Sequence, residues 1–322
     1  MTFSSKALAR GRTSAGRWVM MATALSLALL SACGGGSTQF DPFVPKRLLV
    51  FGDDDSSLDP NGRNHSVNAL GENGVLNCNG NPIWVQQLAG VYGFVFAECN
   101  PSFEPDPKAR MLAIPGAKVA DVAAQVEAQV AAGGFRDKDL ATVLVGTNDL
   151  LELYALYPGL SEATIIAEAR ARGRRAAQIV NRLVSLGAKV VVSDLPDLGL
   201  TPFARAQRAL DSGGVDRAAL LSRLTTAFNE QLGVSVLLDG RFVGLMQAQL
   251  QFQAIDRFPP GAGIGNAVAA ICTAPLPTCT TATLLPDAVA GASLWADDIR
   301  LAPGGHAQLA SLAVSRAQRN PF

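Results

Sequence analysis

An alternation of short apolar runs with longer amphipathic segments constrains the fold of this chain most strongly. In the longer segments apolar residues recur every three or four positions, as from Val119 to Val130, Ile165 to Leu183 and Leu221 to Leu232, and again from Leu309. The pattern predicts an α/β fold, a three-layer α/β/α arrangement with a mainly parallel five-stranded sheet. The expected strands are Leu48–Phe51, Phe94–Ala97, Thr142–Val145, Val190–Ser193 and Phe242–Leu245.

The residues that follow the expected strands are the first candidates for a functional site. In open parallel sheets, ligands bind beyond the carboxyl ends of the strands. The segments at those ends are Gly52–Ser57, Gly146–Asp149, Asp194–Asp197 and the stretch before the last expected helix.

These segments resemble the conserved blocks of the SGNH/GDSL hydrolases, a family of esterases and lipases with a flavodoxin-like sheet. The stretch "FGDDDSS" from Phe51 stands where the family has Phe-Gly-Asp-Ser-Leu-Ser-Asp. "IPGAKVADVAAQV", with Gly116, resembles the second block, and "VGTND", with Asn148, matches the third. "WADDIRLAPGGH" lies where the family has Asp-x-x-His before its last helix.

The resemblance implies acyl transfer on lipids, acylated sugars or short-chain esters, without a cofactor or metal. In that chemistry a serine attacks the ester carbonyl, a histidine takes the proton, and an aspartate orients the histidine. Preorganised donors hold the oxyanion, each worth roughly 3 kcal/mol of barrier. Carried over by position, two of the donors are the Gly116 N–H and the Asn148 amide, and the orienting acid is Asp297.

Two positions depart from the family pattern. Asp54 stands at the serine position and Arg300 at the histidine position. Arginine cannot serve as a general base, because its guanidinium does not lose its proton in proteins. The opposite charges predict a salt bridge in place of the serine–histidine contact, with Asp297 orienting the guanidinium. Ordinary serine-esterase activity is therefore in doubt, and three functions stay open: an ester hydrolase with an altered catalytic set, an inactive protein that binds a ligand or partner at the former cleft, and a structural envelope protein.

Other residues offer alternative catalytic roles. A shifted loop would make Ser56 or Ser57 the nucleophile, and His306 would then be the base. We interpret His306 instead as a residue at a helix N-terminus with local hydrogen bonds, and His65 as a solvated loop histidine. Asp54 itself would serve as a carboxylate nucleophile only with a base for the second step. We interpret the run Asp53–Asp55 as a turn with solvated acids and one salt bridge, and not as a metal site.

The N-terminus has the pattern of an export signal. Lys6, Arg10, Arg12 and Arg17 precede the apolar run Trp18–Leu30, which is too short to span a bilayer comfortably. Leu30-Ser31-Ala32-Cys33 resembles the lipobox of bacterial lipoproteins, which implies acylation of Cys33. Gly34, in place of the aspartate that retains such proteins in the inner membrane, implies the outer membrane. We expect a signal peptide over 1–32, a lipidated cysteine and flexible tether over 33–45, and the hydrolase-like domain over 46–322.

Charge limits the partners. Removal of residues 1–32 takes away four of the 27 Lys and Arg residues and none of the 27 Asp and Glu, which leaves a net charge of −4. We therefore expect no nucleic-acid partner. The expected partners are a small-molecule, lipid or sugar ester ligand and a membrane reached through the lipid anchor, and we expect a monomer.

Four cysteines remain after Cys33, and an oxidising compartment makes disulfides the default. Their spacings do not match the common zinc pairs. Four cysteines allow three connectivities. We favour Cys78–Cys99, which flank one helix–strand unit, and Cys272–Cys279, which bracket the proline-bent loop "TAPLPT".

Overall fold

The computed structural model describes residues 1–2, 43–209, 214–319 and 322. The chain divides into two units, Met1–Asp41 and Pro42–Phe322, and the fold described below is that of the second. Nearly all of the expected signal peptide, Cys33 and most of the expected tether lie outside the described residues. Among the described residues, no helix is long and apolar enough to cross a membrane.

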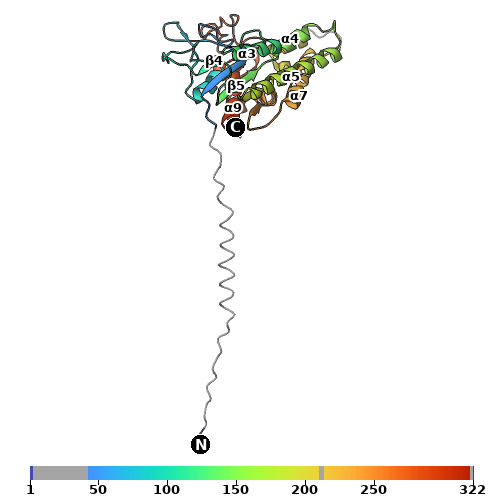
Figure 1. Ribbon diagram of the computed structural model, residues 1–322. Helices are drawn as coiled ribbons and strands as arrows, with labels where there is room; N and C mark the ends of the chain where they lie inside the picture. The colour runs from blue at the N-terminus through green and yellow to red at the C-terminus, as the bar shows by residue number, and fades with distance from the viewer. Residues whose placement is uncertain (3–42, 210–213, 320–321) are drawn as a thin grey trace. The chain divides into compact units, whose positions relative to one another are not determined.

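The described residues form a five-stranded parallel sheet with the strand order β4-β1-β5-β6-β7 (Figure 1), which confirms the expected α/β fold. Strands β1 and β5 are buried along their whole length, which explains why both read as continuous apolar runs. The strands are β1 (Arg47–Gly52), β4 (Ala109–Met111), β5 (Asp139–Leu144), β6 (Lys189–Ser193) and β7 (Val243–Met246).

The strand expected at Phe94–Ala97 was wrong. The edge strand is β4, where Ala109 pairs with Leu48 of β1. Phe96 forms only an isolated bridge with Ala109. An edge strand pairs on one side only, and β4 has an exposed Arg110 at its centre, so it has no apolar run for sequence reasoning to find.

Helices cover the sheet in two layers. The four expected helical segments are confirmed as α3 (Val119–Ala131), α5 (Glu162–Ser185), α7 (Arg217–Ser235) and α9 (Pro303–Arg319). Helix α5 packs against α3 and α7, whereas α9 packs against α2 (Trp84–Val91). The remaining helices are α4 (Thr147–Ala155), α6 (Pro202–Ala209) and α8 (Ala248–Arg257), with short 3-10 turns at Asp54–Ser56, Leu198–Leu200, Pro259–Ala262 and Ala290–Ala292.

Two small sheets and two disulfides organise the loops beyond the main sheet. Both favoured disulfides are present, with Cα–Cα distances of 5.7 Å for Cys78–Cys99 and 5.9 Å for Cys272–Cys279. The small sheets pair β2 (Ala69–Leu70) with β3 (Leu76–Asn77), and β8 (Asn266–Ala270) with β9 (Ser293–Trp295).

Candidate functional site

The site begins where β1 ends. Gly52 has a φ of +154°, and a Cβ atom there would lie 2.5 Å from the Leu144 carbonyl oxygen, so only glycine fits. The Gln125 side chain from α3 holds the Gly52 backbone on both sides, accepting from its N–H and donating to its carbonyl oxygen, each at 3.0 Å. The chain then enters the 3-10 turn Asp54–Ser56, which places Asp54 at the carboxyl edge of the sheet.

Three donors converge on one carboxylate oxygen of Asp54. Its Oδ2 accepts from the Gly116 N–H at 2.9 Å and from the Asn148 Nδ2 at 3.0 Å. The third donor is Arg300, whose Nη2 lies 2.9 Å from the same oxygen. The expected convergence of Gly116 and Asn148 is therefore confirmed, and their shared acceptor is the Asp54 side chain.

The starts of helices α3 and α4 bring the Gly116 and Asn148 donors together. Gly116, with a φ of +76°, lies in the turn that precedes α3, and Asn148 lies in the first turn of α4, directly after β5. The Asn148 amide is fixed at both ends, because its Nδ2 also donates to the Ala117 carbonyl oxygen at 3.0 Å and its Oδ1 accepts from Arg300 Nη2 at 2.7 Å.

The salt bridge expected between Asp54 and Arg300 is present and buried. The Arg300 residue is 8% exposed. Burial alone would lower the pKa of Arg300, but the neighbouring acids Asp55, Asp53 and Asp54 raise it above its ordinary value. Its Nη1 lies 4.0 Å from Asp55 Oδ2 and has no hydrogen-bond partner among the described residues. One half of the guanidinium is thus well bound and the other is not.

Asp297 does not orient the guanidinium in the way that we expected. Its Oδ1 accepts from the backbone N–H groups of Ile299 at 2.8 Å and Arg300 at 2.6 Å. The carboxylate therefore shapes the turn that carries Arg300, while the guanidinium itself is held by Asp54 and Asn148.

The three consecutive acids are buried, and the expectation of solvated acids was wrong. Asp53, Asp54 and Asp55 are 1%, 8% and 7% exposed. Burial would raise the pKa of Asp54, but Arg300, Asn148 and Gly116 hold it below its usual value, so Asp54 is ionised. Burial raises the pKa of Asp55 to about 6. Both oxygens of Asp53 lack a hydrogen-bond partner among the described residues, and burial raises its pKa well above the usual value.

At neutral pH Arg300 therefore lies beside two carboxylates that are ionised, Asp54 and for the most part Asp55, while burial favours the neutral form of Asp53. Among the described residues, no cluster of His, Cys, Asp and Glu has the arrangement of a metal site.

Both alternative serines are fully buried. Ser56 Oγ accepts from the Trp84 Nε1 at 3.2 Å. Ser57 Oγ donates to the Asp54 carbonyl oxygen at 3.0 Å and lies 3.4 Å from His65 Nδ1. His65 is half-buried against this turn, so the interpretation as a solvated loop histidine was wrong, and burial lowers its pKa.

His306 is also buried, in the first turn of α9. Neither ring nitrogen has a hydrogen-bond partner among the described residues, so the expectation of local side-chain hydrogen bonds was wrong. Burial lowers the pKa of His306 to about 3, which keeps the imidazole neutral. The ring contacts neither Ser56 nor Ser57 through a hydrogen bond and is therefore not positioned as their base.

Sequence reasoning missed the role of Asp149, the last residue of "VGTND". Its Oδ2 accepts from the Val119 N–H at 2.9 Å, which ties the start of α3 to the start of α4. Arg172 of α5 donates to the Asp149 carbonyl oxygen at 2.9 Å and contacts Glu152 at 2.6 Å. Asp149 thereby fixes the distance between the Gly116 turn and Asn148. The sequence feature that could have indicated this role is the acidic residue directly after Asn148.

The parallel sheet covered by helices is the fold of a GDSL-type hydrolase, and the Gly116 and Asn148 donors converge at its carboxyl edge. The chain belongs to the GDSL-like lipase/acylhydrolase family, whose model matches residues 83–290. The matched span contains Gly116 and Asn148, but it begins after Asp54 and ends before Arg300. Family membership therefore rests on the span that holds Gly116 and Asn148 and not on positions 54 and 300.

Solved structures of low sequence identity are similar to this chain. A member of the lipolytic G-D-S-L family from Veillonella parvula is 12% identical, with a TM-score of 0.42, covering 84% of this chain and 96% of its own. A catalytic mutant of an acetylxylan esterase from Geobacillus stearothermophilus is 14% identical, with a TM-score of 0.44, covering 84% of this chain and 94% of its own. Among curated proteins, none matches the chain.

Proposed function

We propose that this chain is a lipid-anchored envelope protein that keeps the GDSL hydrolase fold but does not hydrolyse esters through a serine, and that it binds a ligand or partner at the former cleft. One observation carries the proposal. The Asp54 Oδ2 atom accepts from Gly116, Asn148 and Arg300, so an internal carboxylate occupies the donors that would hold a substrate oxyanion.

Electrostatics supports a closed site. An oxyanion hole accelerates acyl transfer because its donors meet negative charge that develops only in the transition state. Here those donors already meet a full negative charge on Asp54. A substrate carbonyl would have to displace that carboxylate, and its neutral oxygen would leave Arg300 without its hydrogen-bonded counter-charge.

The residues that would move the proton are unsuited to it. Arg300 keeps its proton. His306 is neutral but enclosed, and both alternative serines are fully buried. The donors for catalysis are thus retained while the proton transfer is lost.

A second candidate function is ester hydrolysis by an altered catalytic set. The observation that favours it is the 3.4 Å approach of Ser57 Oγ to His65 Nδ1. This pair would need the turn Asp54–Ser56 to open, because Ser57 is fully buried.

Activity assays separate the two candidates. We expect no turnover of p-nitrophenyl esters and no labelling by a fluorophosphonate that reacts with activated serines. The double variant Asp54→Ser with Arg300→His is expected to gain weak esterase activity and labelling at position 54, because the Gly116 and Asn148 donors are in place. Labelling of the unmodified chain that is lost in Ser57→Ala would support the second candidate and overturn the first.

The envelope location rests on the N-terminal pattern. A basic segment, an apolar run and Leu30-Ser31-Ala32-Cys33 support export and acylation, and Gly34 supports the outer membrane. The intact mass of the mature chain tests this: we expect an N-terminus at Cys33 with attached acyl chains, which Cys33→Ser abolishes.

A further inference from the structure

The edge of the sheet opposite the site has its own surface chemistry. All five strands are parallel, so the segments that lead into them meet at one edge. The Lys46 N–H donates to the Lys138 carbonyl oxygen at 2.8 Å, and Lys189 Nζ lies over the rings of Phe43 and Phe242 at 5.8 and 4.5 Å. These contacts join the segments into one continuous surface. We call it the amino-end face and define it by residues 43–46, 106–108, 134–138, 186–189 and 235–242.

The amino-end face is basic, although the chain after residue 32 is acidic. Its segments hold six basic side chains and three acidic ones. Lys46, Lys108 and Arg136 of the face and Arg110 of β4 line one hollow. Asp106, Asp137 and the internally paired Arg47 and Asp139 line it as well, so basic residues outnumber acidic ones there by two. The basic residues are Lys46, Lys108, Arg136, Lys138, Lys189 and Arg241, and the acidic ones are Asp106, Asp137 and Asp239.

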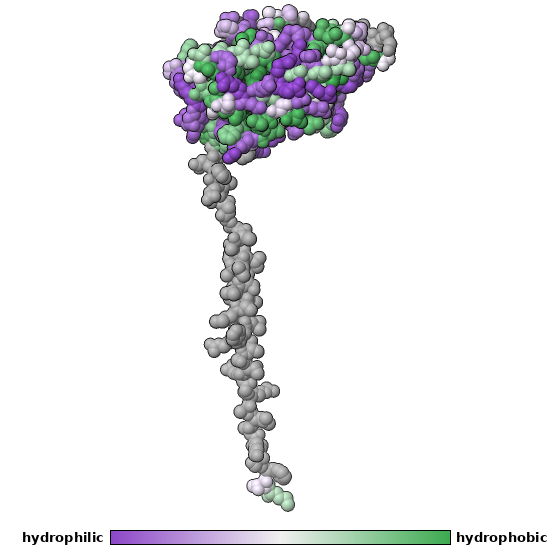
Figure 2. Space-filling view, turned by 45° about the vertical axis from the view of Figure 1, so that its right-hand side comes forward, coloured by the Kyte–Doolittle hydropathy of each residue, from purple (hydrophilic) through white to green (hydrophobic). Residues whose placement is uncertain are grey.

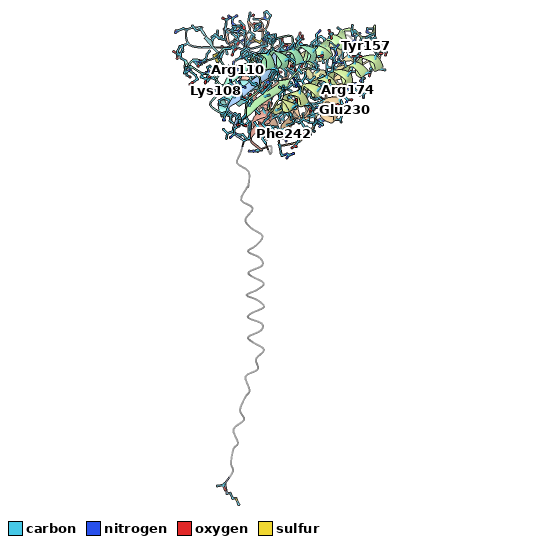
Figure 3. All side chains as sticks on the ribbon, viewed as in Figure 1. Lys108, Arg110, Tyr157, Arg174, Glu230 and Phe242 are labelled. Carbon is cyan, nitrogen blue, oxygen red and sulfur yellow. A yellow bond between two sulfur atoms is a disulfide. The ribbon has the colours of Figure 1, made fainter. Side chains whose placement is uncertain are left out.

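The same face exposes apolar side chains beside these charges. Val44, Leu237 and Leu238 are 59%, 73% and 54% exposed, and Phe242 is 37% exposed. Figure 2 shows apolar and polar residues side by side along the lower side of the folded unit, and Figure 3 places Phe242 on that side, away from Tyr157. Basic residues mixed with exposed apolar and aromatic side chains are typical of surfaces that bind at a lipid–water interface.

The chain connection points to the same face. Cys33, where we propose the lipid anchor, precedes Phe43 by ten residues, and a chain of that length spans at most about 35 Å. Phe43 and Val44 belong to the amino-end face and lead directly into β1. A bilayer that holds the anchor is therefore within reach of this face.

We infer that the amino-end face docks on an anionic phospholipid surface and turns the candidate site away from that membrane. The inference rests on the proposed lipid anchor. The exposed basic side chains of the face, with Arg110 beside them, attract the lipid phosphates, and Leu237, Leu238 and Phe242 enter the interface next to them. The six residues of β1 separate the two edges by about 20 Å. Asp54 then faces the aqueous compartment, so the ligand of the former cleft reaches it from solution and not from the anchoring bilayer.

Hydrogen exchange on vesicles tests the docking. The processed protein is reconstituted into vesicles of phosphatidylglycerol with phosphatidylethanolamine, and into vesicles of phosphatidylcholine alone. We expect residues 43–46 and 235–242 to exchange at least about five-fold more slowly on the anionic vesicles, since a single basic residue near an anionic surface already contributes about five-fold to binding. The protection is expected to disappear in high salt.

Charge variants provide the matched control. Lys46→Glu with Lys108→Glu is expected to remove the protection, because both side chains lie on the face and are exposed. Arg170→Glu with Arg174→Glu makes the same change of charge on exposed positions of α5 and is expected to leave the protection intact. Equal loss in both variants would show an effect of net charge alone and would contradict a docking face.

Other outcomes overturn the inference in distinguishable ways. Equal exchange on both kinds of vesicle rules out docking on anionic lipid. Protection that appears in detergent without vesicles and grows with protein concentration assigns the face to a second copy of the chain. The mass of the N-terminal peptide reports acylation separately. Binding of a chain without acyl groups to the same vesicles is measured by co-sedimentation, and we expect the same dependence on lipid charge.

Discussion

Two buried arginine–aspartate pairs stand at opposite ends of β1, and they differ in how completely they are satisfied. At the amino end, Arg47 binds Asp139 with two hydrogen bonds, Nε to Oδ1 at 2.8 Å and Nη2 to Oδ2 at 2.5 Å. The Arg136 N–H adds a further bond to the Asp139 Oδ2 at 2.7 Å. At the carboxyl end, Arg300 contacts Asp54 through Nη2 alone, and its Nη1 has no hydrogen-bond partner among the described residues.

The difference distinguishes a fully bonded ion pair from one whose guanidinium is bonded on one side only. A bidentate pair with its remaining groups bonded is the arrangement in which a buried ion pair is tolerated. In the Asp54–Arg300 pair, Asp54 also accepts from Gly116 and Asn148, and the pair lies beside Asp53 and Asp55, which burial pushes toward their neutral forms. We therefore expect this pair to contribute less to stability than the Arg47–Asp139 pair.

Removal of the carboxylate charge from each pair should give the largest difference in stability between them. Asp139→Asn leaves Arg47 buried without a counter-charge and is expected to lower the free energy of unfolding by about 3–5 kcal/mol. Asp54→Asn should lower it by only about 1 kcal/mol, because the amide oxygen still accepts hydrogen bonds and Asp55, ionised above about pH 6, stays 4.0 Å from the guanidinium. Urea unfolding midpoints at constant m-value measure both. Equal losses would contradict the distinction.

The second prediction concerns pH and Asp55. Its pKa is raised to about 6 in the folded chain, so the folded state binds a proton that the unfolded state has released. The stability from this proton is fully present below about pH 4 and is lost as the pH rises through about 6, a loss of roughly 2–3 kcal/mol. Asp55→Asn should remove that loss, because asparagine does not titrate.

The unfolding free energies of the unmodified chain and of Asp55→Asn are compared at pH 4.5 and pH 7.5. Both proteins must be measured because Asp194, with a pKa also raised to about 6, titrates in both. Unfolding free energies that fall by the same amount in both proteins between these pH values would show that Asp55 does not carry the effect.

The sequence predicted the long helices, the sheet apart from its edge strand, and the convergence of Gly116 and Asn148, because each had a local signature. Gly116 and Asn148 lie in short stretches that resemble conserved family blocks. The opposite charges of Asp54 and Arg300 predicted their contact. The state of Asp53 and Asp55, by contrast, depends on burial by residues distant in the sequence. The same holds for His65, which a loop of polar residues suggested was solvated, and for the edge strand β4, which has no apolar run.

A smaller effect should follow from emptying the site. Asp54→Ala leaves Arg300 with the Gly116 N–H and the Asn148 amide around a space of carboxylate size. Added acetate is expected to refill it and to raise the unfolding free energy by about 1 kcal/mol at concentrations several-fold above its dissociation constant. The matched control is Asp139→Ala, in which Arg47 at the amino end of β1 is enclosed. We expect acetate not to stabilise this variant. Acetate that stabilises neither variant, or both equally, would contradict an open donor set at position 54.

The smallest effect is expected at the surface beside the amino-end pair. Lys46 lies 3.8 Å from Asp137, and the two side chains are 67% and 82% exposed. Solvent screens such a pair, so Lys46→Glu should change the unfolding free energy by no more than about 0.5 kcal/mol. The neighbouring Arg47–Asp139 pair is shielded from the change because its hydrogen bonds are internal. The measurement is the urea midpoint in the absence of lipid, with Asp137→Lys as the matched reversal.

Loss of vesicle docking in Lys46→Glu with this small change in stability would assign the role of Lys46 to the membrane and not to the fold. A decrease in the unfolding free energy above about 2 kcal/mol would instead place Lys46 in the network of the buried Arg47–Asp139 pair.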